Sequence, residues 1–309
     1  MRILVAGAGG VGSYFGGRLA EAGVAVTFFV REGRARQLEQ HGLVVRSPHG
    51  DIRRRVDYVV PRELAQTYDL ILLCCKAYQL EGIVAGLGPA VGPQTVVLPL
   101  LNGLRHLDYL DTHLPGASVI GGLCLIGVTL EPSGEAVQLD RLHALTFGER
   151  RPAQADACRA IAAVFQRARF DSRWSREVEQ DLWEKWVMLT TLASATCLLR
   201  ASIGEIMRTS SGESLVRTLL AEVRQVASAS GHASRPAAAA IAEKLLTTPG
   251  SSTTASMLRD IERGALTEAQ HVVGDMLARA RASGASAPLL EVALCHLEAY
   301  EVRRSAGRA

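Results

Sequence analysis

The stretch RILVAGAGGVGSYFGGRLAEAGVAVTFFV, residues 2–30, decides the fold of this chain. A short apolar run at residues 2–6 leads into a glycine-rich turn, and a helical pattern continues from there to about residue 22. Gly23 interrupts that pattern, and residues 24–30 form a second apolar run of strand type. Strand, turn, helix and strand within about 30 residues predict a βαβ unit.

The glycine-rich turn has the spacing of a dinucleotide-binding site. It reads Gly7-Ala8-Gly9-Gly10-Val11-Gly12. In such a turn the first glycine permits the tight bend, the second lets backbone approach a pyrophosphate, and the third lets the helix pack on the strand. The helix N-terminus offers N–H groups and partial positive charge to phosphates. Because a strand precedes this turn and a helix follows it, we expect these six residues to bind a dinucleotide.

The end of the second strand indicates which cofactor is used. An NAD site usually has Asp or Glu there, which binds the ribose 2′-hydroxyl. This chain has Arg31, and arginine attracts a 2′-phosphate in a bidentate manner. The sequence therefore predicts NADP(H), with Arg31 as the principal contact and Arg34 as a second candidate. A solvated surface arginine is the alternative for each, and Glu32 argues against NADP(H) only if it faces the ribose instead of Arg31.

Two further apolar runs in the first half are each followed by a polar residue. Residues 69–75 precede Lys76, and residues 95–98 are followed by a loop that contains Asn102. Strands that alternate with helices predict a parallel, doubly wound sheet of the Rossmann type. Ligands of such sheets bind at the carboxyl ends of the strands, which is where Lys76 and Asn102 are expected. Polar loop residues on the surface are the alternative interpretation.

The character of the chain changes near residue 170. Residues 119–147 predict antiparallel strands with a turn at 132–134, and residues 153–169 predict a helix. From residue 177 onward only long, alanine-rich helical patterns follow, which favour an all-α domain because alanine is the best helix former. We therefore expect an NADP-binding Rossmann domain at residues 1–170 and a helical substrate and catalytic domain at residues 171–309.

Lysine is rare in this chain. Of 34 basic residues only Lys76, Lys185 and Lys244 are lysines. Arginine keeps its proton in proteins whereas lysine can lose it, so a lysine in such a chain points to a role that arginine cannot fill. One of them interrupts an apolar stripe at helical spacing, formed by Val178, Leu182, Lys185, Leu189 and Ala193. A buried charge without a role is costly; a lysine reaching past the edge of the stripe into water is the alternative. Lys244 is expected on a solvated helix face.

Composition argues against several other functions. A net charge of +3 is too small to indicate nucleic acid or an anionic membrane as a partner. The six cysteines form no C-x-x-C pair and the eight histidines have no metal-type spacing, so we expect reduced core thiols and no metal. The apolar runs are far short of a bilayer span, and the chain starts on a strand, without room for a signal peptide. These features predict a cytoplasmic protein.

In combination, these motifs resemble the ketopantoate reductase (2-dehydropantoate 2-reductase) family over nearly the whole chain. The likeness rests on the glycine turn, Arg31, Lys76, Asn102-Gly103, Leu182-Trp183-x-Lys185, the stretch SMLRDIERG at residues 256–264, and Glu268. The family joins a Rossmann domain to a helical domain and reduces a 2-oxo acid with NADPH. The resemblance implies that Lys185 is the catalytic acid, that Glu268 assists at the site beside the cofactor, and that Ser256 binds substrate. It also implies that Lys76 and Asn102 line the cleft beside the nicotinamide.

The chain departs from this family on the helix of Lys185. Where the family has asparagines four and eight residues after the lysine, this chain has Leu189 and Ala193, and Thr253 replaces a third asparagine. With Leu189 and Ala193 at the substrate positions, we expect a substrate less polar than ketopantoate. Thr196 lies near the same face by helical spacing and is the one hydroxyl expected to replace a lost contact.

Two other functions stay open at this point. One is a 3-hydroxyacid or opine-type dehydrogenase on the same architecture. The other is an NADP-binding regulator without turnover, which would be indifferent to replacement of Lys185. The sequence specifies neither the small-molecule substrate nor the physiological direction. A homodimer is compatible with it, although no feature of the sequence requires one.

Overall fold

The computed structural model describes residues 1–307, which form two compact units. The first unit contains residues 1–101 and 106–179; the second contains residues 102–105 and those from 180 onward. The division thus falls about ten residues later than the predicted one near 170. Strand β13 (Asp171–Trp174) explains the difference, because it pairs in parallel with β12 (Ala144–Gly148) and keeps the chain in the first unit.

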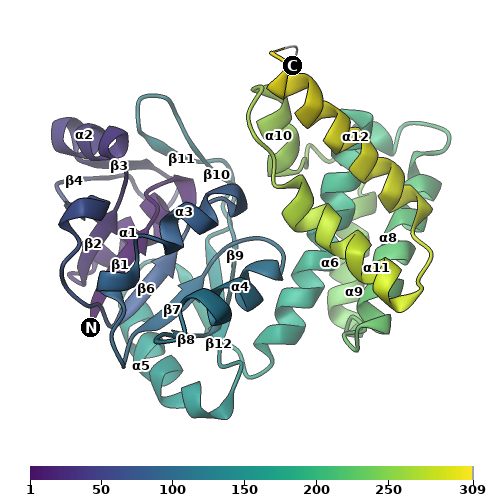
Figure 1. Ribbon diagram of the computed structural model, residues 1–309. Helices are drawn as coiled ribbons and strands as arrows, with labels where there is room; N and C mark the ends of the chain where they lie inside the picture. Colours follow the sequence, from purple (N-terminus) through teal and green to yellow (C-terminus); the bar gives the residue numbers. More distant parts are fainter. Residues whose placement is uncertain (308–309) are drawn as a thin grey trace. The chain divides into compact units, whose positions relative to one another are not determined.

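A six-stranded parallel sheet forms the centre of the first unit (Figure 1). Its spatial order is β5 (Asp57–Val59), β2 (Ala25–Phe29), β1 (Arg2–Ala6), β6 (Leu70–Leu73), β7 (Val96–Pro99) and β8 (Ser118–Val119). Numbered along the chain within this sheet, that order is 3-2-1-4-5-6, which is the Rossmann order. The predicted doubly wound sheet is confirmed. The order reverses between β1 and β6, and ligands of such sheets bind beyond the strand ends at that point.

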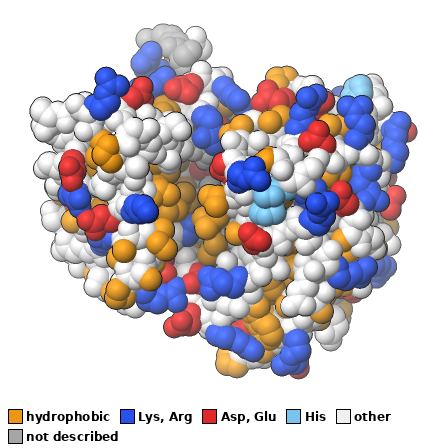
Figure 2. All heavy atoms as spheres, turned by 180° about the vertical axis from the view of Figure 1, so that it is seen from behind, with side chains coloured by type: hydrophobic (Ala, Val, Ile, Leu, Met, Phe, Trp, Pro, Cys, Tyr) orange, Lys and Arg blue, Asp and Glu red, His pale blue; other side chains and the backbone are white. Residues whose placement is uncertain are grey.

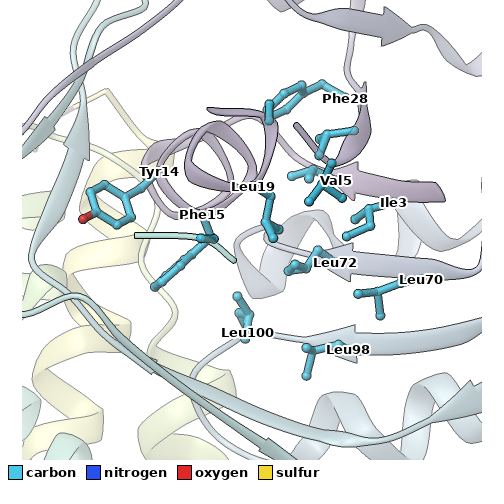
Figure 3. Packing of buried hydrophobic residues seen from close by; sticks show 14 of the residues in the cluster. Ile3, Val5, Tyr14, Phe15, Leu19, Phe28, Leu70, Leu72, Leu98 and Leu100 are labelled. Carbon is cyan, nitrogen blue, oxygen red and sulfur yellow. The ribbon is translucent and has the colours of Figure 1, made fainter. Parts of the chain in front are cut away.

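Helix α1 (Gly10–Glu21) covers one face of this sheet. Figure 3 shows Leu19 of this helix directed toward side chains of the neighbouring strands, whereas the ring of Phe15 packs edge-to-face on that of Phe170, with 5.1 Å between the centroids. The strand side chains alternate along β1, β6 and β7 and belong to one buried cluster: Ile3, Val5, Leu70, Leu72 and Leu98. Residues on the opposite face, such as Leu4 and Ile71, are also fully buried. Both faces are therefore covered, as expected of a parallel sheet.

The other helices of the first unit are α2 (Glu32–His41), α3 (Leu80–Val84), α4 (Arg105–His113) and α5 (Ala155–Phe165). The helix predicted at residues 153–169 corresponds to α5, preceded by a short 3-10 turn at Pro152–Gln154. Its buried residues Cys158, Ile161 and Phe165 belong to the same hydrophobic cluster as β1 and α1. Helix α5 is therefore part of the core of this unit.

Two smaller sheets complete the first unit. Within the region predicted as antiparallel, β9 (Gly121–Leu125) pairs with β12, and β10 (Val128–Leu130) pairs with β11 (Ala136–Gln138), both antiparallel as predicted. The turn between β10 and β11 closes with a hydrogen bond from the N–H of Gly134 to the carbonyl of Glu131. Strands β3 (Leu43–Arg46) and β4 (Ile52–Arg54), which the sequence did not predict, extend this sheet from β11.

The second unit contains helices and no strand in its part up to residue 307, which confirms the predicted all-α character. Its helices are α6 (Val178–Leu199), α7 (Ile203–Ile206), α8 (Gly212–Ala229), α9 (Pro236–Thr247), α10 (Ser256–Glu262), α11 (Asp275–Ser283) and α12 (Pro288–Ser305). Figure 1 shows α8, α11 and α12 side by side, and these three pack against one another through α8. Arg235, just before α9, forms ion pairs with Asp181 and Glu184 and so fastens the start of α6.

Several expectations from composition can be compared with this structure. All six cysteines are free, but Cys295 on α12 is exposed, so the prediction of core thiols is wrong for that residue. No helix in the described chain combines the length and the apolar character that crossing a membrane needs. Among residues 1–307, no group of His, Cys, Asp and Glu side chains could hold a metal ion. On the face shown in Figure 2, basic and acidic side chains are interspersed.

Candidate active site

The turn between β1 and α1 has a backbone that only glycine permits at two positions. Gly7 has a φ of 107°, a conformation that residues with a side chain rarely adopt. A Cβ atom at Gly12 would lie 1.9 Å from the carbonyl oxygen of Gly7, so the helix could not pack this closely on the strand with any other residue. Around Gly9, in contrast, no atom lies within 4 Å of the corresponding Cβ position. The middle of the turn therefore leaves room for a ligand.

The N-terminus of α1 fits the phosphates of a dinucleotide. Gly9 precedes the helix, and its carbonyl accepts the N–H of Ser13 at 2.9 Å, which starts the helical pattern. No side chain caps the first turn. Its N–H groups therefore need an acceptor from outside the helix, and a phosphate is a suitable one. The first unit thus has the donor set that a dinucleotide cofactor requires.

Arg31 lies where the sequence places it, between β2 and α2, and it is exposed. The neighbouring carboxylate of Glu32 forms an ion pair with Arg62 at 3.4 Å. Glu32 is thus directed to a basic partner. Arg62 lies in the 3-10 turn Pro61–Glu63 that follows β5, and it also pairs with Glu63 at 3.5 Å.

Arg34, the second candidate for the 2′-phosphate, has another role in the structure. Its guanidinium donates hydrogen bonds to the carbonyls of Ala8 and Gly134 and to the side chains of Ser13 and Gln37. Burial lowers the pKa of Arg34. Since four of its five N–H groups have acceptors within the protein, Arg34 holds the glycine turn against the β10–β11 turn. Of these two arginines, Arg31 therefore remains the candidate for binding the 2′-phosphate.

Lys76 follows β6, as predicted, and is half-buried. It precedes the 3-10 turn Ala77–Gln79, whose last side chain accepts the backbone N–H of Lys76 at 3.4 Å. Strand β6 pairs with β1 at the reversal of the strand order. Lys76 therefore stands at the strand end where ligands of doubly wound sheets bind.

Asn102 belongs with Lys185 rather than with the sheet that precedes it. The segment 102–105 follows β7 in the chain but is part of the second unit. The Nζ of Lys185 donates a hydrogen bond to the Oδ1 of Asn102 at 3.1 Å. Two predicted site residues that are 83 positions apart are thus brought into direct contact inside one unit.

The apolar stripe around Lys185 on α6 is present as the spacing predicts. Val178, Leu182 and Ala193 are buried, whereas Lys185 and Leu189 are each half-buried. Ala193 is only 4% exposed, so among the apolar residues of this stripe Leu189 is the one that a ligand beside Lys185 can reach. A helix face with one lysine and one accessible leucine can hold a polar oxygen next to an apolar group.

The structure does not support Thr196 as a substitute substrate contact. Thr196 is fully buried, and its hydroxyl donates to the carbonyl of Leu192 at 2.7 Å and accepts the N–H of Ala255 at 3.3 Å. Both hydrogen bonds lie within the protein. Thr196 therefore fastens the start of α10 to α6, directly before the exposed Ser256. Thr253 is half-buried, and its hydroxyl accepts a hydrogen bond from Ser251 at 2.9 Å.

Glu268 lies two residues before an unusual turn of the chain. It is 8% exposed, and its carbonyl accepts the N–H groups of His271 and Val272 at 3.1 and 2.9 Å. A π-helical turn, Gln270–Gly274, then leads into α11. Such turns are rare and occur frequently at functional sites. The carbonyl of Val272 accepts the indole N–H of Trp186 at 3.0 Å, so this turn is attached to the helix of Lys185.

His271 is a site residue that the sequence analysis missed. It is half-buried in the π-helical turn, and burial lowers the pKa of its ring, while the carboxylates of Glu268 and Asp275 act in the opposite direction. A hydrogen bond links the ring to the backbone of Asn102. The one available signal in the sequence was a titratable ring three residues after Glu268.

A Rossmann sheet with a dinucleotide turn, followed by a helical unit with an accessible lysine, defines a class of two-domain oxidoreductases. Residues 3–152 match the ketopantoate reductase PanE/ApbA family, and residues 177–301 match the C-terminal domain of the same family. The chain belongs to the ketopantoate reductase family and is an oxidoreductase of the class that acts on CH–OH groups.

Individual relatives extend over the whole chain. The uncharacterized oxidoreductase YkpB of Bacillus subtilis is 33% identical over 304 residues, which cover 98% of this chain and 100% of that protein. The 2-dehydropantoate 2-reductase structure from Methylococcus capsulatus is 27% identical, with a TM-score of 0.86 over 99% of this chain and 98% of its own. D-mandelate dehydrogenase, solved with NADH and anilino(oxo)acetate, is similar in fold, with a TM-score of 0.88 at 22% identity over 99% of this chain and 100% of its own.

Proposed function

We propose that this protein is an NADPH-dependent reductase that converts a 2-oxo acid with an apolar side chain to the 2-hydroxy acid. The observation that carries the proposal is the half-buried Lys185, which donates to Asn102 at 3.1 Å on a helix face where Leu189 is an accessible apolar neighbour. We infer the reaction type from the family, and the preference among 2-oxo acids from the residues around Lys185.

The cofactor assignment rests on the first unit. The glycine turn and the uncapped α1 fit the pyrophosphate, and Arg31 is exposed at the strand end where the ribose 2′-position is recognised. Glu32, paired with Arg62, does not offer the lone carboxylate typical of NAD sites. When bound, NADPH supplies the hydride. Lys76 is the basic residue assigned to this cofactor or to the acid group of the substrate.

Lys185 is assigned as the proton donor. An ammonium group has three N–H donors, and Asn102 accepts one of them. In the proposed reaction a second N–H points to the carbonyl oxygen of the 2-oxo acid, stabilises the negative charge that develops there, and transfers its proton to that oxygen. Asn102 fixes the direction of the ammonium. Glu268 and Ser256 are assigned to the same site, as an assisting carboxylate and a substrate hydroxyl contact.

The substrate preference follows from Leu189. A substrate hydroxyl placed against this side chain would lose its water without gaining a partner, which costs roughly 1–3 kcal/mol. Thr196 does not compensate, because both of its hydrogen bonds are internal. We therefore assign an aliphatic or aromatic 2-oxo acid, rather than ketopantoate with its hydroxyl group, as the preferred substrate.

The proposal includes a cytoplasmic setting and no macromolecular partner for catalysis. The six free cysteines are those of a protein kept in a reducing environment. The interspersed charges in Figure 2 offer no single basic surface on that face to nucleic acid or to an anionic membrane. The partner in this account is the small 2-oxo acid.

The test is a substrate panel with the full-length protein. NADPH oxidation is followed by absorbance with aliphatic and aromatic 2-oxo acids and with ketopantoate, in parallel with NADH, and Lys185→Ala serves as the matched inactive control. We expect turnover with NADPH and with the acids that lack a hydroxyl. Binding of NADPH without turnover of any 2-oxo acid would instead identify a non-catalytic NADP-binding regulator.

A further inference from the structure

The π-helical turn makes two connections to the Lys185–Asn102 pair. Trp186, next to Lys185 on α6, donates its indole N–H to the carbonyl of Val272 at 3.0 Å. His271, the residue before Val272, is linked through its ring to the backbone of Asn102. Asn102 in turn accepts the Nζ of Lys185. The contacts therefore form a closed circuit from α6 through the π-helical turn to the 102–105 segment and back to α6.

The contact between His271 and the 102–105 segment is close. Gly103 has a φ of 78°, and a Cβ at this position would lie 3.0 Å from the carbonyl oxygen of His271 and 3.1 Å from its ring Cδ2. Only glycine lets the segment approach the ring in this way. His271 thus approaches Gly103 closely and forms a hydrogen bond with the backbone of the preceding residue, Asn102. These two contacts restrict movement of the 102–105 segment.

The hydrogen bond has a defined direction. It favours the protonated ring, so a ring N–H is the donor and the backbone carbonyl of Asn102 is the acceptor. A neutral imidazole keeps one N–H and can still donate it. The charged groups that act on the ring are Glu268, Asp275 and Arg105, and burial outweighs the two carboxylates, so the neutral form is the one present at neutral pH.

We propose that His271 is a positioning residue that holds Asn102 in place, so that the Oδ1 of Asn102 directs the ammonium of Lys185. This inference rests on the proposed function insofar as Lys185 donates the proton. His271 itself acts through Asn102. The extra residue of the π-helical turn brings the ring to the Asn102 carbonyl while the Val272 carbonyl stays with Trp186. The turn therefore serves both connections at once.

The first test needs no activity. Amide hydrogen exchange of the 102–105 segment is measured in the wild type, in His271→Phe, which keeps a ring but has no donor, and in His271→Gln, which restores an N–H. We expect His271→Phe to speed exchange in this segment by roughly two- to tenfold, the equivalent of one hydrogen bond, and His271→Gln to reverse most of the change. Unchanged exchange in His271→Phe would overturn the proposal, whatever the catalytic function proves to be.

A matched control separates this effect from general loosening. His296 on α12 is also half-buried in the second unit, and its Nε2 has no hydrogen-bond partner among residues 1–307. His296→Phe should leave exchange of the 102–105 segment unchanged. An equal acceleration in His296→Phe would show that any change of a buried histidine loosens the unit, and the specific role of His271 would be refuted.

The second test is kinetic and uses a double-mutant cycle. His271→Phe should lower kcat by about 10- to 100-fold with little change in KM or in NADPH affinity, because a misplacement of 1 Å can cost about 10²-fold in rate. In an Asn102→Ala background the same change should have no further effect, since the side chain that His271 positions is gone. If the two substitutions lowered kcat by factors that multiply in the double variant, His271 would not act through Asn102. An inactive wild type would refute the proposed function but leave the exchange result decisive for His271.

Discussion

In the proposed function, the glycine turn of the first unit and the cluster around Lys185 in the second recognise their ligands by different means. The turn uses the backbone of six consecutive residues, and two of them tolerate no side chain, Gly7 for its φ and Gly12 for its 1.9 Å approach. The cluster uses side chains from segments far apart in the sequence, joined by hydrogen bonds such as that of Lys185 to Asn102. A binding site made of backbone atoms changes little when side chains are substituted. A binding site made of side chains can lose single ligand contacts by substitution while the fold is kept. This is how a chain can keep the family's cofactor turn and carry Leu189 beside its lysine.

The largest expected effect comes from removing the lysine. If proton transfer resides in the second unit, Lys185→Ala should lower turnover by about 10²–10⁴-fold, the usual contribution of a general acid. NADPH affinity should change little, because the residues assigned to the pyrophosphate and the 2′-phosphate, the glycine turn and Arg31, belong to the first unit. Steady-state rates and fluorescence titration with NADPH measure the two quantities separately.

Lys185→Arg refines this prediction. Arginine keeps the positive charge but does not give up a proton, so it should restore little of the activity. Full activity in Lys185→Arg would show that the residue is an electrostatic anchor and that the proton comes from elsewhere.

The substrate comparison has the next largest effect. Ketopantoate should be a poor substrate, because each hydroxyl that meets an apolar wall costs roughly 1–3 kcal/mol, equivalent to about 5- to 150-fold in specificity. Leu189→Asn should narrow the gap by restoring a polar partner on the same helix face. The measurement is kcat/KM for ketopantoate and for 2-oxo acids without a hydroxyl. A value for ketopantoate well above the others would mean that other residues have replaced the family's asparagines.

Cofactor preference comes third. A charge-assisted hydrogen bond contributes about 1.5–3 kcal/mol, so Arg31 should give NADPH an advantage of roughly 10- to 100-fold over NADH. Arg31→Ala should remove most of that advantage and leave NADH binding nearly intact. Arg36 is exposed on α2, the helix that begins directly after Arg31, and Arg36→Ala is the control substitution, for which we expect an unchanged cofactor preference. Equal dissociation constants of the two cofactors in the wild type would contradict the NADPH assignment.

The smallest effect concerns stability alone. Thr196→Val leaves the buried N–H of Ala255 without an acceptor and should lower the free energy of unfolding by about 1–3 kcal/mol. Thr191 is the matched control, since it is equally buried on α6 and donates to Val187 but accepts no such N–H. Urea unfolding of Thr196→Val and Thr191→Val isolates the contribution of the Ala255 hydrogen bond. Equal losses would show that Thr196 does not fasten α10.

The sequence predicts the parts of this molecule that depend on local pattern. The βαβ unit, the glycine turn, a parallel doubly wound sheet and the all-α second half were all expected from periodicity and turn residues. Strand β13 was not, because its residues Asp171–Trp174 are half-exposed and largely polar, and only pairing with β12 makes them a strand. In the structure this strand belongs to the first unit, which extends to residue 179.

The side-chain roles were less predictable, because they depend on contacts between distant residues. Arg34 was only a second candidate for the 2′-phosphate, with a surface arginine as the alternative; in the structure the β10–β11 turn, 100 residues further on, accepts one of its hydrogen bonds. Thr196 was placed correctly on its helix, yet only the fold brings the N–H of Ala255 to its hydroxyl. His271 carries no motif, and its proximity to Asn102 arises from a π-helical turn that no sequence pattern announced.

The central claim is that this chain reduces a 2-oxo acid with NADPH, and isotope transfer tests it most directly. The wild-type protein is supplied with NADPH that carries deuterium at both C4 positions of the nicotinamide and with an apolar 2-oxo acid, and the 2-hydroxy acid is analysed by mass spectrometry. We predict one deuterium at C2 of the product, with the hydroxyl proton taken from Lys185 and exchangeable with water. Absence of a deuterated product, with NADPH still bound, would contradict the account and leave a cofactor-binding protein without this activity.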